Sequence, residues 1–409
     1  MSDADALLAR LVERHAGRVA DLDARLAAAG LGATCPPTWQ TLEAVPPRAK
    51  SDLAELQRTR PDFGGLAPRS LRPSAVFWSP GGLTEPQVGA AVQRLAELLH
   101  DAGFTAGDRV ANGFSYHFTP GGLLVHEALL QLGATVLPIG PQQTAQAADF
   151  LAAAQASAYV GTASHLQALM RALDALPPER ARPPLRLALA GTEPLGDAIR
   201  RELGTQYGIR CLDFYGTAEI GVVAVGCAAD AGLHLHPQVL AELVEPATGT
   251  RSAQPEGELL LSADADELPL LRFATGDLAR LEEGACSCGR HTPRLRILGR
   301  VGESARVRGM LLHASQLRAF ARAAGLAACR VTLTRREGRD HIELRYRAKA
   351  AAGASAQVAN ARADAEAIAQ AFRDHYRLRA DVQGADATLA EAEIALADRR
   401  TEAALEGRT

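Results

Sequence analysis

The chain contains very little lysine: of its 44 basic side chains, only Lys50 and Lys349 are lysines. A compact ammonium group for a phosphate or a carboxylate can therefore come from only two positions. Aromatic residues are also scarce, at 4% of the sequence, so a local cluster of them carries information. The formal net charge of −3 argues against nucleic acid or an anionic membrane as a partner, because both attract strongly basic surfaces.

Long apolar runs are absent too. No stretch reaches the roughly eighteen residues of a membrane-spanning helix, and residues 1–30 are charged and amphipathic, without the apolar core of a signal peptide. The six cysteines are too few for a disulfide framework in a chain of 409 residues, and they fit reduced thiols, some of them binding metal. These features predict a cytoplasmic globular protein of several domains.

The predicted fold class is α/β. In residues 75–221, apolar strand-like runs alternate with helical patterns, which predicts a mainly parallel sheet with helices on both faces. Residues 1–74 form a helical segment of the same large N-terminal domain, and residues 222–299, with short strands between turns, predict a small β-barrel or sheet. Residues 300–409 predict a small α+β domain that moves about Gly299–Gly302.

Two local patterns suggest binding sites, and the residues alone leave an alternative to each. Ser79–Pro86 reads SPGGLTEP, after an apolar run and before a helix expected from about Val88 to Ala102. Strand, glycine turn and helix are the layout of a phosphate-binding loop, but an ordinary β-α connection has the same pattern. Cys286-Ser287-Cys288-Gly289 places two thiols where they can chelate one metal, although two unrelated cysteine groups in a reduced protein remain the alternative.

Several motifs occur in an order that resembles the phenylacetate-CoA ligase branch of the adenylate-forming enzymes. They are GTEP (191–194), DFYGTAE (213–219), GLH (232–234), TGD (275–277), CSCGR (286–290) and the Gly299-Arg300 pair. The resemblance extends from about Leu42 to the tail. It implies the adenylate-forming fold and an enzyme that uses ATP and Mg²⁺ to convert a carboxylic acid, often aromatic, into an acyl-adenylate, and then transfers the acyl group to coenzyme A.

The resemblance also implies roles for individual residues. The nucleotide would lie against Gly191, Thr192, Glu193, Asp213, Phe214, Tyr215, Gly216, Thr217 and Asp277. Glu219 would hold Mg²⁺, for which a carboxylate is a suitable hard ligand, and Arg300 would lie near ribose or phosphate. The acid pocket would be lined by Phe114, Tyr116, His117 and Phe118. A closed structural Zn²⁺ site would be formed by Cys227, His234, Cys286 and Cys288, with His236 and His291 as nearby alternatives.

Four departures from the family pattern weaken the expected ATP chemistry. Glu85 stands where the phosphate loop has lysine, and Ala218 stands where a hydroxyl residue touches the α-phosphate. Gly302-Glu303 replaces the hinge aspartates, and the tail has no lysine, which leaves Arg399 or Arg400 as the substitute. Loss of a positioned charge of this kind costs orders of magnitude in rate.

Three functions follow as hypotheses. The first is an acid-activating ligase with altered phosphate contacts. The second is a non-adenylating descendant that binds an acid, an acyl-adenylate or an acyl thioester, or assists a partner enzyme. The third is an acyltransferase with His117 as base. The expected partners are a small carboxylic acid and a nucleotide, with a homodimer or a pathway enzyme as the candidate protein partner.

Overall fold

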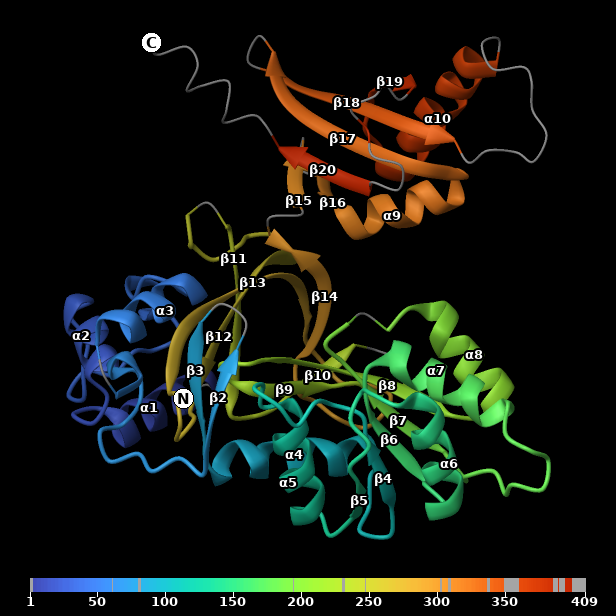
Figure 1. Ribbon diagram of the computed structural model, residues 1–409. Helices are drawn as coiled ribbons and strands as arrows, with labels where there is room; N and C mark the ends of the chain where they lie inside the picture. The colour runs from blue at the N-terminus through green and yellow to red at the C-terminus, as the bar shows by residue number, and fades with distance from the viewer. Residues whose placement is uncertain are drawn as a thin grey trace. The chain divides into compact units, whose positions relative to one another are not determined.

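The computed structural model describes residues 3–60, 62–79, 82–193, 195–229, 232–246, 248–301, 304–307, 310–336, 339–348, 360–384, 389 and 394–398. The chain divides into two compact units. The first comprises Met1–Thr275 and Arg280–Arg296, and the second comprises Gly276–Ala279 and Ile297–Thr409. Each unit has a sheet and a hydrophobic core of its own (Figure 1).

The helices of the first unit surround its main sheet (Figure 1). They are α1 (Asp3–His15), α2 (Ala20–Ala28), α3 (Lys50–Thr59), α4 (Gly89–Ala102), α5 (Gly121–Gln131), α6 (Thr144–Ala154), α7 (Ala163–Asp174) and α8 (Asp197–Tyr207), with short 3₁₀ turns η1 (Leu42–Ala44) and η2 (Asp62–Gly65). The expected helix after the glycine turn is confirmed, since α4 ends at Ala102 and Gly103 follows it with a left-handed backbone, as a C-terminal glycine does.

The strands of this sheet follow a continuous order, β11-β12-β13-β14-β10-β9-β8-β7-β6-β4-β5, with β1 paired to β13. Their bounds are β1 (Arg48–Ala49), β4 (Arg109–Asn112), β5 (Thr135–Leu137), β6 (Ala158–Gly161), β7 (Leu187–Ala190), β8 (Arg210–Thr217), β9 (Gly221–Val225), β10 (Leu233–Leu235), β11 (Val239–Val244), β12 (Glu256–Ala263), β13 (Leu270–Glu282) and β14 (Arg294–Arg300). Strands β4 to β8 pair in parallel, and the direction changes at β8–β9.

Both faces of the parallel strands are covered, as the continuous apolar runs predict. Within β6, Ala158 and Val160 face a core shared with α4 and α5, whereas Tyr159 faces the opposite core, shared with α6 and α7. The α/β class is therefore confirmed. The strands of residues 222–299, expected as a small β-barrel or sheet, extend the main sheet from β9 to β11, and in the described part of the chain their pairing does not close into a barrel.

The segment expected to be a strand, a glycine turn and then a helix has an extra strand. Strands β2 (Ala75–Ser79) and β3 (Leu83–Gln87) form an antiparallel hairpin around Gly82, and α4 begins only after β3. Pro86 does not prevent this, because a two-stranded hairpin leaves each strand with an edge that needs no N–H donor. Pro80 and Gly81, at the tip of the expected phosphate loop, lie outside the described residues.

The second unit contains a mixed sheet of order β19-β18-β17-β20 and a short β15–β16 hairpin. Its elements are β15 (Ser304–Val307), β16 (Met310–His313), α9 (Ala314–Ala323), β17 (Leu326–Arg336), β18 (Arg339–Ala348), α10 (Asn360–Tyr376), β19 (Asp381–Gly384) and β20 (Ile394–Asp398). Helices α9 and α10 meet in the core of this unit, where the rings of Phe320 and Phe372 contact edge to face, 5.5 Å apart. Gly302, the last residue of the expected hinge Gly299–Gly302, lies outside the described residues, as do Glu303 and the Arg399–Arg400 pair.

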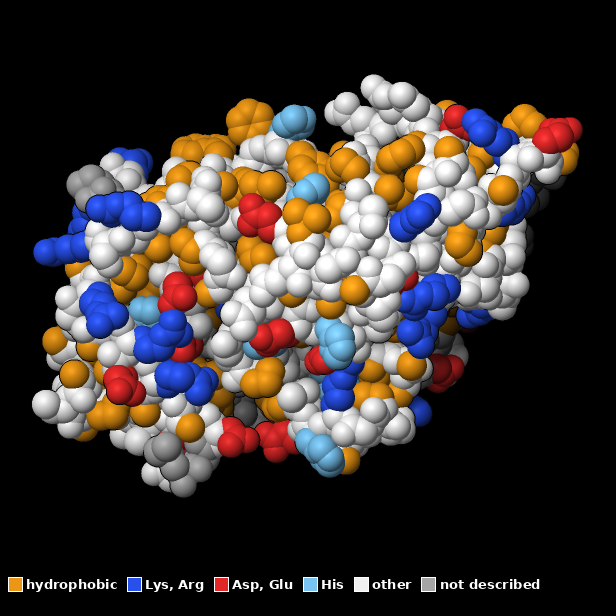
Figure 2. Space-filling view, turned by 90° about the horizontal axis from the view of Figure 1, so that it is seen from below, with side chains coloured by type: hydrophobic (Ala, Val, Ile, Leu, Met, Phe, Trp, Pro, Cys, Tyr) orange, Lys and Arg blue, Asp and Glu red, His pale blue; other side chains and the backbone are white. Residues whose placement is uncertain are grey.

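Acidic and basic side chains are interspersed over the face of the first unit seen from below, and neither sign forms a continuous field there (Figure 2). Among the described helices, none combines the length and the apolar character that crossing a membrane requires.

Candidate functional site

Two of the motifs expected at the nucleotide, Gly191–Glu193 and Asp213–Thr217, lie at the carboxyl-terminal parts of two adjacent parallel strands. Ala190, the last residue of β7, pairs with Asp213 in β8, so Gly191–Glu193 and Asp213–Tyr215 lie side by side. Ligands bind at such strand ends in open α/β sheets. Pro194, the fourth residue of the first motif, lies outside the described residues.

Close backbone packing explains two glycines in these motifs. A Cβ atom on Gly191 would fall 2.4 Å from the ring of Phe214, and one on Gly216 would fall 2.6 Å from the carbonyl oxygen of Gly221. Thr192 adopts a left-handed backbone with φ of 67°, which is uncommon for a residue other than glycine. Such strained residues concentrate at ligand sites, which favours this turn as part of one.

Charged side chains fix the two strand ends. Asp213 forms an ion pair with Arg200 of α8, and the same arginine donates from Nη1 to the carbonyl oxygen of Cys211 at 3.0 Å. Glu193 Oε1 accepts a 2.6 Å hydrogen bond from the backbone N–H of Ser164, the second residue of α7. Contacts with the neighbouring helices α7 and α8 therefore help to fix the positions of both motif segments.

The aromatic segment after β4 divides into a buried part and an exposed part. Phe114 contacts Phe214 edge to face, with ring centroids 6.0 Å apart, and Tyr116 hydrogen-bonds to His126 Nδ1 at 3.1 Å. Burial raises the pKa of Tyr116, so its hydroxyl stays protonated. By contrast, His117 is exposed and Phe118 is 78% exposed. Phe114 and Tyr116 are thus half-buried against neighbouring side chains, whereas His117 and Phe118 are exposed.

Glu219 has a partner that the sequence analysis did not assign. Its carboxylate is buried at 5% exposure, and Lys50 Nζ lies 2.7 Å from Oε1. Lys50 is the first residue of α3, directly after β1, and the pairing of β1 with β13 sets its position. The sequence did contain one hint of a role for Lys50, because it is one of only two lysines in the chain. No sequence pattern, however, relates Lys50 to Glu219, which follows it by 169 residues.

Glu85 is buried, although its position in the expected phosphate loop suggested a side chain near the bound phosphates. Its side chain is only 3% exposed and lines a cavity together with Glu219. Burial, and then the negative charge of Glu219, raise the pKa of Glu85 to about 7, against the opposing effect of Ser79 and Lys50. Its charge therefore acts on the carboxylate expected to hold Mg²⁺.

Asp277 and Arg300 lie together in the second unit. Arg300 Nε is 3.2 Å from Asp277 Oδ1, and the arginine side chain remains 63% exposed while the aspartate is 14% exposed. Gly276, the centre of the Thr-Gly-Asp turn, has a left-handed backbone with φ of 72°, which suits glycine. The ribose acceptor and the phosphate-side arginine expected from the sequence are thus direct neighbours.

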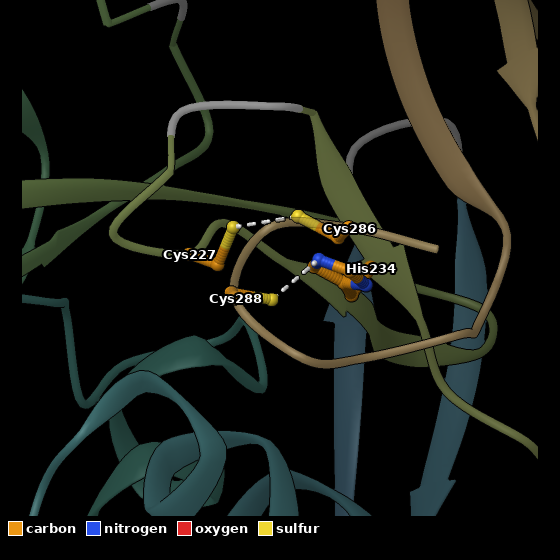
Figure 3. A group of neighbouring side chains, drawn as sticks. All are labelled: Cys227, His234, Cys286 and Cys288. Carbon is orange, nitrogen blue, oxygen red and sulfur yellow. Dashed lines mark hydrogen bonds between the residues drawn. The ribbon is translucent and has the colours of Figure 1, made fainter. Parts of the chain in front are cut away.

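The four residues expected to bind zinc converge on one point (Figure 3). One ligand atom from each of Cys227, His234, Cys286 and Cys288 lies within 4.8 Å of all the others. The sulfurs of Cys227 and Cys286 are 3.8 Å apart, and Cys288 Sγ is 3.3 Å from His234 Nε2. Two thiolates about 2.3 Å from one tetrahedral Zn²⁺ would lie about 3.8 Å apart, so the donor set fits the metal.

Hydrogen bonds around these four residues position the turn and the imidazole ring and affect the thiol pKa values. The Cys-x-Cys-Gly segment forms a tight turn, in which Gly289 N–H donates to the carbonyl oxygen of Cys286 at 2.9 Å. A backbone hydrogen bond at Cys288 lowers the pKa of the Cys286 thiol to about 7, whereas burial raises the pKa of the Cys288 thiol, so Cys286 is the thiol of this turn that more readily becomes a thiolate. His234 Nδ1 lies 3.1 Å from Thr292 Oγ1, a contact that directs Nε2 toward the sulfurs.

The alternative ligands are engaged elsewhere or exposed. His236 Nε2 is 3.0 Å from Glu97 Oε2, and its Nδ1 accepts from the backbone of Gln238. His291 is exposed and is not part of the group. Neither residue therefore competes for the fourth position.

Comparison with solved structures identifies the fold. Over 96% of this chain and 91% of the other, the structure resembles an open conformation of 2-hydroxyisobutyryl-CoA ligase in complex with 2-HIB-AMP and CoA, with a TM-score of 0.80 and 21% identity. The same ligase in its postadenylation state gives a TM-score of 0.72. The fold is that of the adenylate-forming enzymes.

Sequence comparison narrows the likeness to one branch. The chain is 32% identical over 243 residues to phenylacetate-coenzyme A ligase of Escherichia coli (strain K12) and 30% identical over 250 residues to that of Thermus thermophilus. Each match covers 58% of this chain and 55% of the relative, so it spans about half the length of these proteins. No family model matches the chain. The resemblance to the phenylacetate-CoA ligase branch is confirmed.

Proposed function

We propose that the chain is an ATP-dependent ligase that activates a small, aromatic or related carboxylic acid as an acyl-adenylate and transfers the acyl group to coenzyme A. The observation that carries the proposal is the convergence of the two nucleotide motifs at adjacent strand ends, Gly191–Glu193 beside Asp213–Tyr215. The fold of the adenylate-forming enzymes and the phenylacetate-CoA ligase relatives support it.

The residues present fit the proposed ligands. The backbone of Gly191 and the ring of Phe214 offer a flat surface to the adenine, and Phe114 packs against that ring. Glu219 offers a buried carboxylate to Mg²⁺, a hard cation that takes oxygen ligands and supplies positive charge at the phosphates when bound. We further propose that Asp277 accepts hydrogen bonds from the ribose hydroxyls, beside Arg300.

Lys50 supplies an ammonium group that the phosphate loop and the tail of this chain lack, because neither segment contains lysine. The tail arginines and Lys349 lie outside the described residues, whereas Lys50 Nζ reaches Glu219 at 2.7 Å. We propose that this ammonium group stabilises negative charge at the reacting carboxylate or α-phosphate, as a positioned cation does in a site of this kind. Structural Zn²⁺ bound by the Cys227 group then holds the β9–β10 and β13–β14 connections and takes no part in the chemistry.

The test is calorimetric titration with ATP and Mg²⁺, followed by acid-dependent release of pyrophosphate over a panel of aromatic acids. The proposal expects binding and turnover by the wild type, and a fall in turnover of about a hundredfold or more for Lys50→Met. An equal turnover by wild type and Lys50→Met would remove Lys50 from the chemistry. Absence of ATP binding at millimolar concentration would reject the ligase and favour the non-adenylating descendant, for which the buried Glu85 beside Glu219 is the specific support.

The acyltransferase hypothesis makes a separate prediction about His117. This side chain is exposed, so His117→Ala is expected to change the free energy of unfolding by less than about 0.5 kcal/mol. If the ligase proposal holds, the variant also keeps its rate of pyrophosphate release. A large loss of acyl transfer at unchanged stability would instead support His117 as a base, and thermal unfolding with a thioester assay distinguishes the two results.

A further inference from the structure

Helix α4 carries one charged side chain in its buried stripe. Apolar residues of this helix recur at helical spacing and pack in the core shared with β9, among them Ala91, Leu95 and Leu98. Arg94 lies among them and is only 1% exposed. Arginine is almost never buried to this extent unless it is paired, so the contacts of Arg94 indicate what it does.

The guanidinium of Arg94 contacts the turn that carries Glu219, between β8 and β9. Arg94 Nη2 donates a hydrogen bond to the carbonyl oxygen of Ile220. The N–H of Ile220 donates to Thr217 Oγ1 at 3.3 Å, so both polar backbone groups of the residue after Glu219 are held. Gly221 follows with a left-handed backbone, with φ of 82°, and a Cβ atom there would fall 3.8 Å from Arg94 Nη2. The arginine therefore fixes the end of the turn, one residue from the buried carboxylate.

The stability of the fold does not explain this arginine. Among the described residues, its Nε and Nη1 atoms are buried without a hydrogen-bond partner, and no carboxylate forms an ion pair with it. Burial lowers the pKa of Arg94 and raises the pKa of Glu267, and the opposite charge of the other residue counteracts each shift. Apolar side chains of similar volume often replace buried charges at no cost in stability. A buried charge that stability does not favour is typical of a functional site.

Helix α4 is itself fixed beyond Arg94. One turn further along, Glu97 Oε2 lies 3.0 Å from His236 Nε2. In the last turn, the carbonyl oxygen of Asp101 accepts a hydrogen bond from Arg290, whose Nη1 also lies 3.8 Å from Asp101 Oδ2. Both partners follow one of the four expected zinc ligands by two positions. A side chain on such an anchored helix can hold a site more precisely than a loop can.

We propose that Arg94 is a positioning residue which, through the carbonyl group of Ile220, holds the carboxylate of Glu219 where it can bind Mg²⁺ together with the nucleotide. The inference rests on the proposed function, in which Glu219 holds Mg²⁺, and adds a residue that touches neither metal nor substrate. Lys50 contacts the carboxylate itself, 2.7 Å away, whereas Arg94 acts on the backbone that carries it. Groups that orient a metal ligand in this way typically contribute ten- to a hundredfold to metal affinity or activity.

Pyrophosphate release by Arg94→Met, measured over a range of Mg²⁺ concentrations at saturating ATP, tests the proposal. The Mg²⁺ concentration that gives half the maximal rate is expected to rise about ten- to a hundredfold above that of the wild type. Arg94→Lys keeps a positive charge and a donor, so it is expected to recover part of this loss. A smaller amount of folded protein would lower the maximal rate and leave the Mg²⁺ requirement unchanged.

The double variant Arg94→Met with Glu267→Gln separates positioning from charge balance. Removing both buried charges is expected to restore the stability of the wild type in chemical denaturation, because neither charge is left uncompensated. The raised Mg²⁺ requirement is expected to persist, since the carbonyl oxygen of Ile220 still lacks its donor. If the double variant instead recovers the Mg²⁺ requirement of the wild type, Arg94 only balances the charge of Glu267 and the proposal is wrong.

Arg186→Met is the matched control. Arg186 also donates to a backbone carbonyl oxygen, that of Gly103 at 3.2 Å, and its Nη2 lies 2.6 Å from Asp108 Oδ2. These contacts lie at the end of α4 away from the turn and before β7 begins. The control is therefore expected to keep the Mg²⁺ requirement of the wild type.

Hydrogen exchange without nucleotide gives a readout that does not depend on the ligase. Residues 217–221 are expected to exchange faster in Arg94→Met than in the wild type or in Arg186→Met, because the turn opens more often without its buried donor. A wild type that releases no pyrophosphate rejects the ligase, and exchange then still decides whether Arg94 holds the turn. Unchanged exchange in Arg94→Met, or an active Arg94→Met with the Mg²⁺ requirement of the wild type, overturns the proposal.

Discussion

A variant with both thiols of the turn removed, Cys286→Ser with Cys288→Ser, is expected to lose bound zinc and to unfold at a much lower temperature than the wild type. The four ligand atoms come from three separate segments of the first unit, at residue 227, at residue 234 and at residues 286–288. A metal that binds the folded chain alone stabilises it by about 4 kcal/mol when its free concentration is a thousandfold above its dissociation constant. The measurements are zinc content by elemental analysis and thermal unfolding with and without a chelator.

The control for this experiment is Cys35→Ser, because Cys35 is exposed and outside the group. That variant is expected to keep one zinc per chain and the unfolding temperature of the wild type. Chelation should lower the stability of the wild type and of the control, but should leave the double variant unchanged. A wild-type chain purified under reducing conditions with no zinc, or a double variant that retains it, would contradict the assignment.

The group of Cys227, His234, Cys286 and Cys288 was the part of the candidate site that the sequence predicted best. Cys286 and Cys288 lie in one turn, so their spacing already indicates a shared ligand, and the turn has the hydrogen bond expected of it. Cys227 and His234 lie about sixty and fifty residues earlier, and only the resemblance to the family connected them to the turn. The pairing of β10 with both β9 and β14 is what brings the three segments together.

The parallel part of the fold was predictable for a different reason. Residues of β6 and β7 are apolar on both faces, and a strand that is buried on both sides reads as an uninterrupted apolar run. The hairpin of β2 and β3 was not predicted, because an apolar run, a glycine turn and a helical pattern indicated one strand followed directly by a helix. This matters for the candidate site, because the hairpin determines that the side chain of Glu85 is buried beside Glu219.

Glu85 shows why local sequence was insufficient at the site. From its position in the loop, its charge was expected to repel a triphosphate if the side chain faced it. The structure places the side chain inside the first unit, beside Glu219. The relation of Lys50 to Glu219 was equally hidden, because it depends on the parallel pairing of Arg48 with Phe273 and of Ala49 with Ala274. Long-range pairing of this kind leaves no periodic signal in either segment.

The segment that carries Lys50 depends on a buried arginine. Arg272 is 1% exposed, and its guanidinium lies 3.1 Å from Glu242 Oε2, whose side chain is equally buried. The same group donates to the carbonyl oxygen of Val45 at 2.8 Å and to that of Gly249 at 3.0 Å. Val45 lies three residues before Arg48, where β1 begins, so Arg272 holds the chain just before Lys50 against the body of the first unit.

Replacing this arginine, as Arg272→Met, is expected to lower the free energy of unfolding by about 3–5 kcal/mol. The loss is large because Glu242 would remain buried with only Arg251, whose Nε lies 3.4 Å from Oε1, as a basic partner, and removing one member of a buried ion pair is strongly destabilising. The measurement is chemical denaturation. Arg280→Met is the matched control: Arg280 lies on the same strand and pairs with Glu256, but its side chain is 45% exposed, so its loss is expected to cost about 1 kcal/mol or less.

The double variant Arg272→Met with Glu242→Leu distinguishes the charge from the backbone contacts. If the buried charge of Glu242 dominates, the double variant recovers most of the lost stability, since an apolar pair can replace a buried ion pair at little cost. If the bonds to Val45 and Gly249 dominate, the double variant stays as unstable as Arg272→Met. In the second case Lys50 is no longer held beside Glu219, and the proposed ligase activity of the folded variant falls as it does for Lys50→Met. Equal stability of Arg272→Met and Arg280→Met would contradict both accounts.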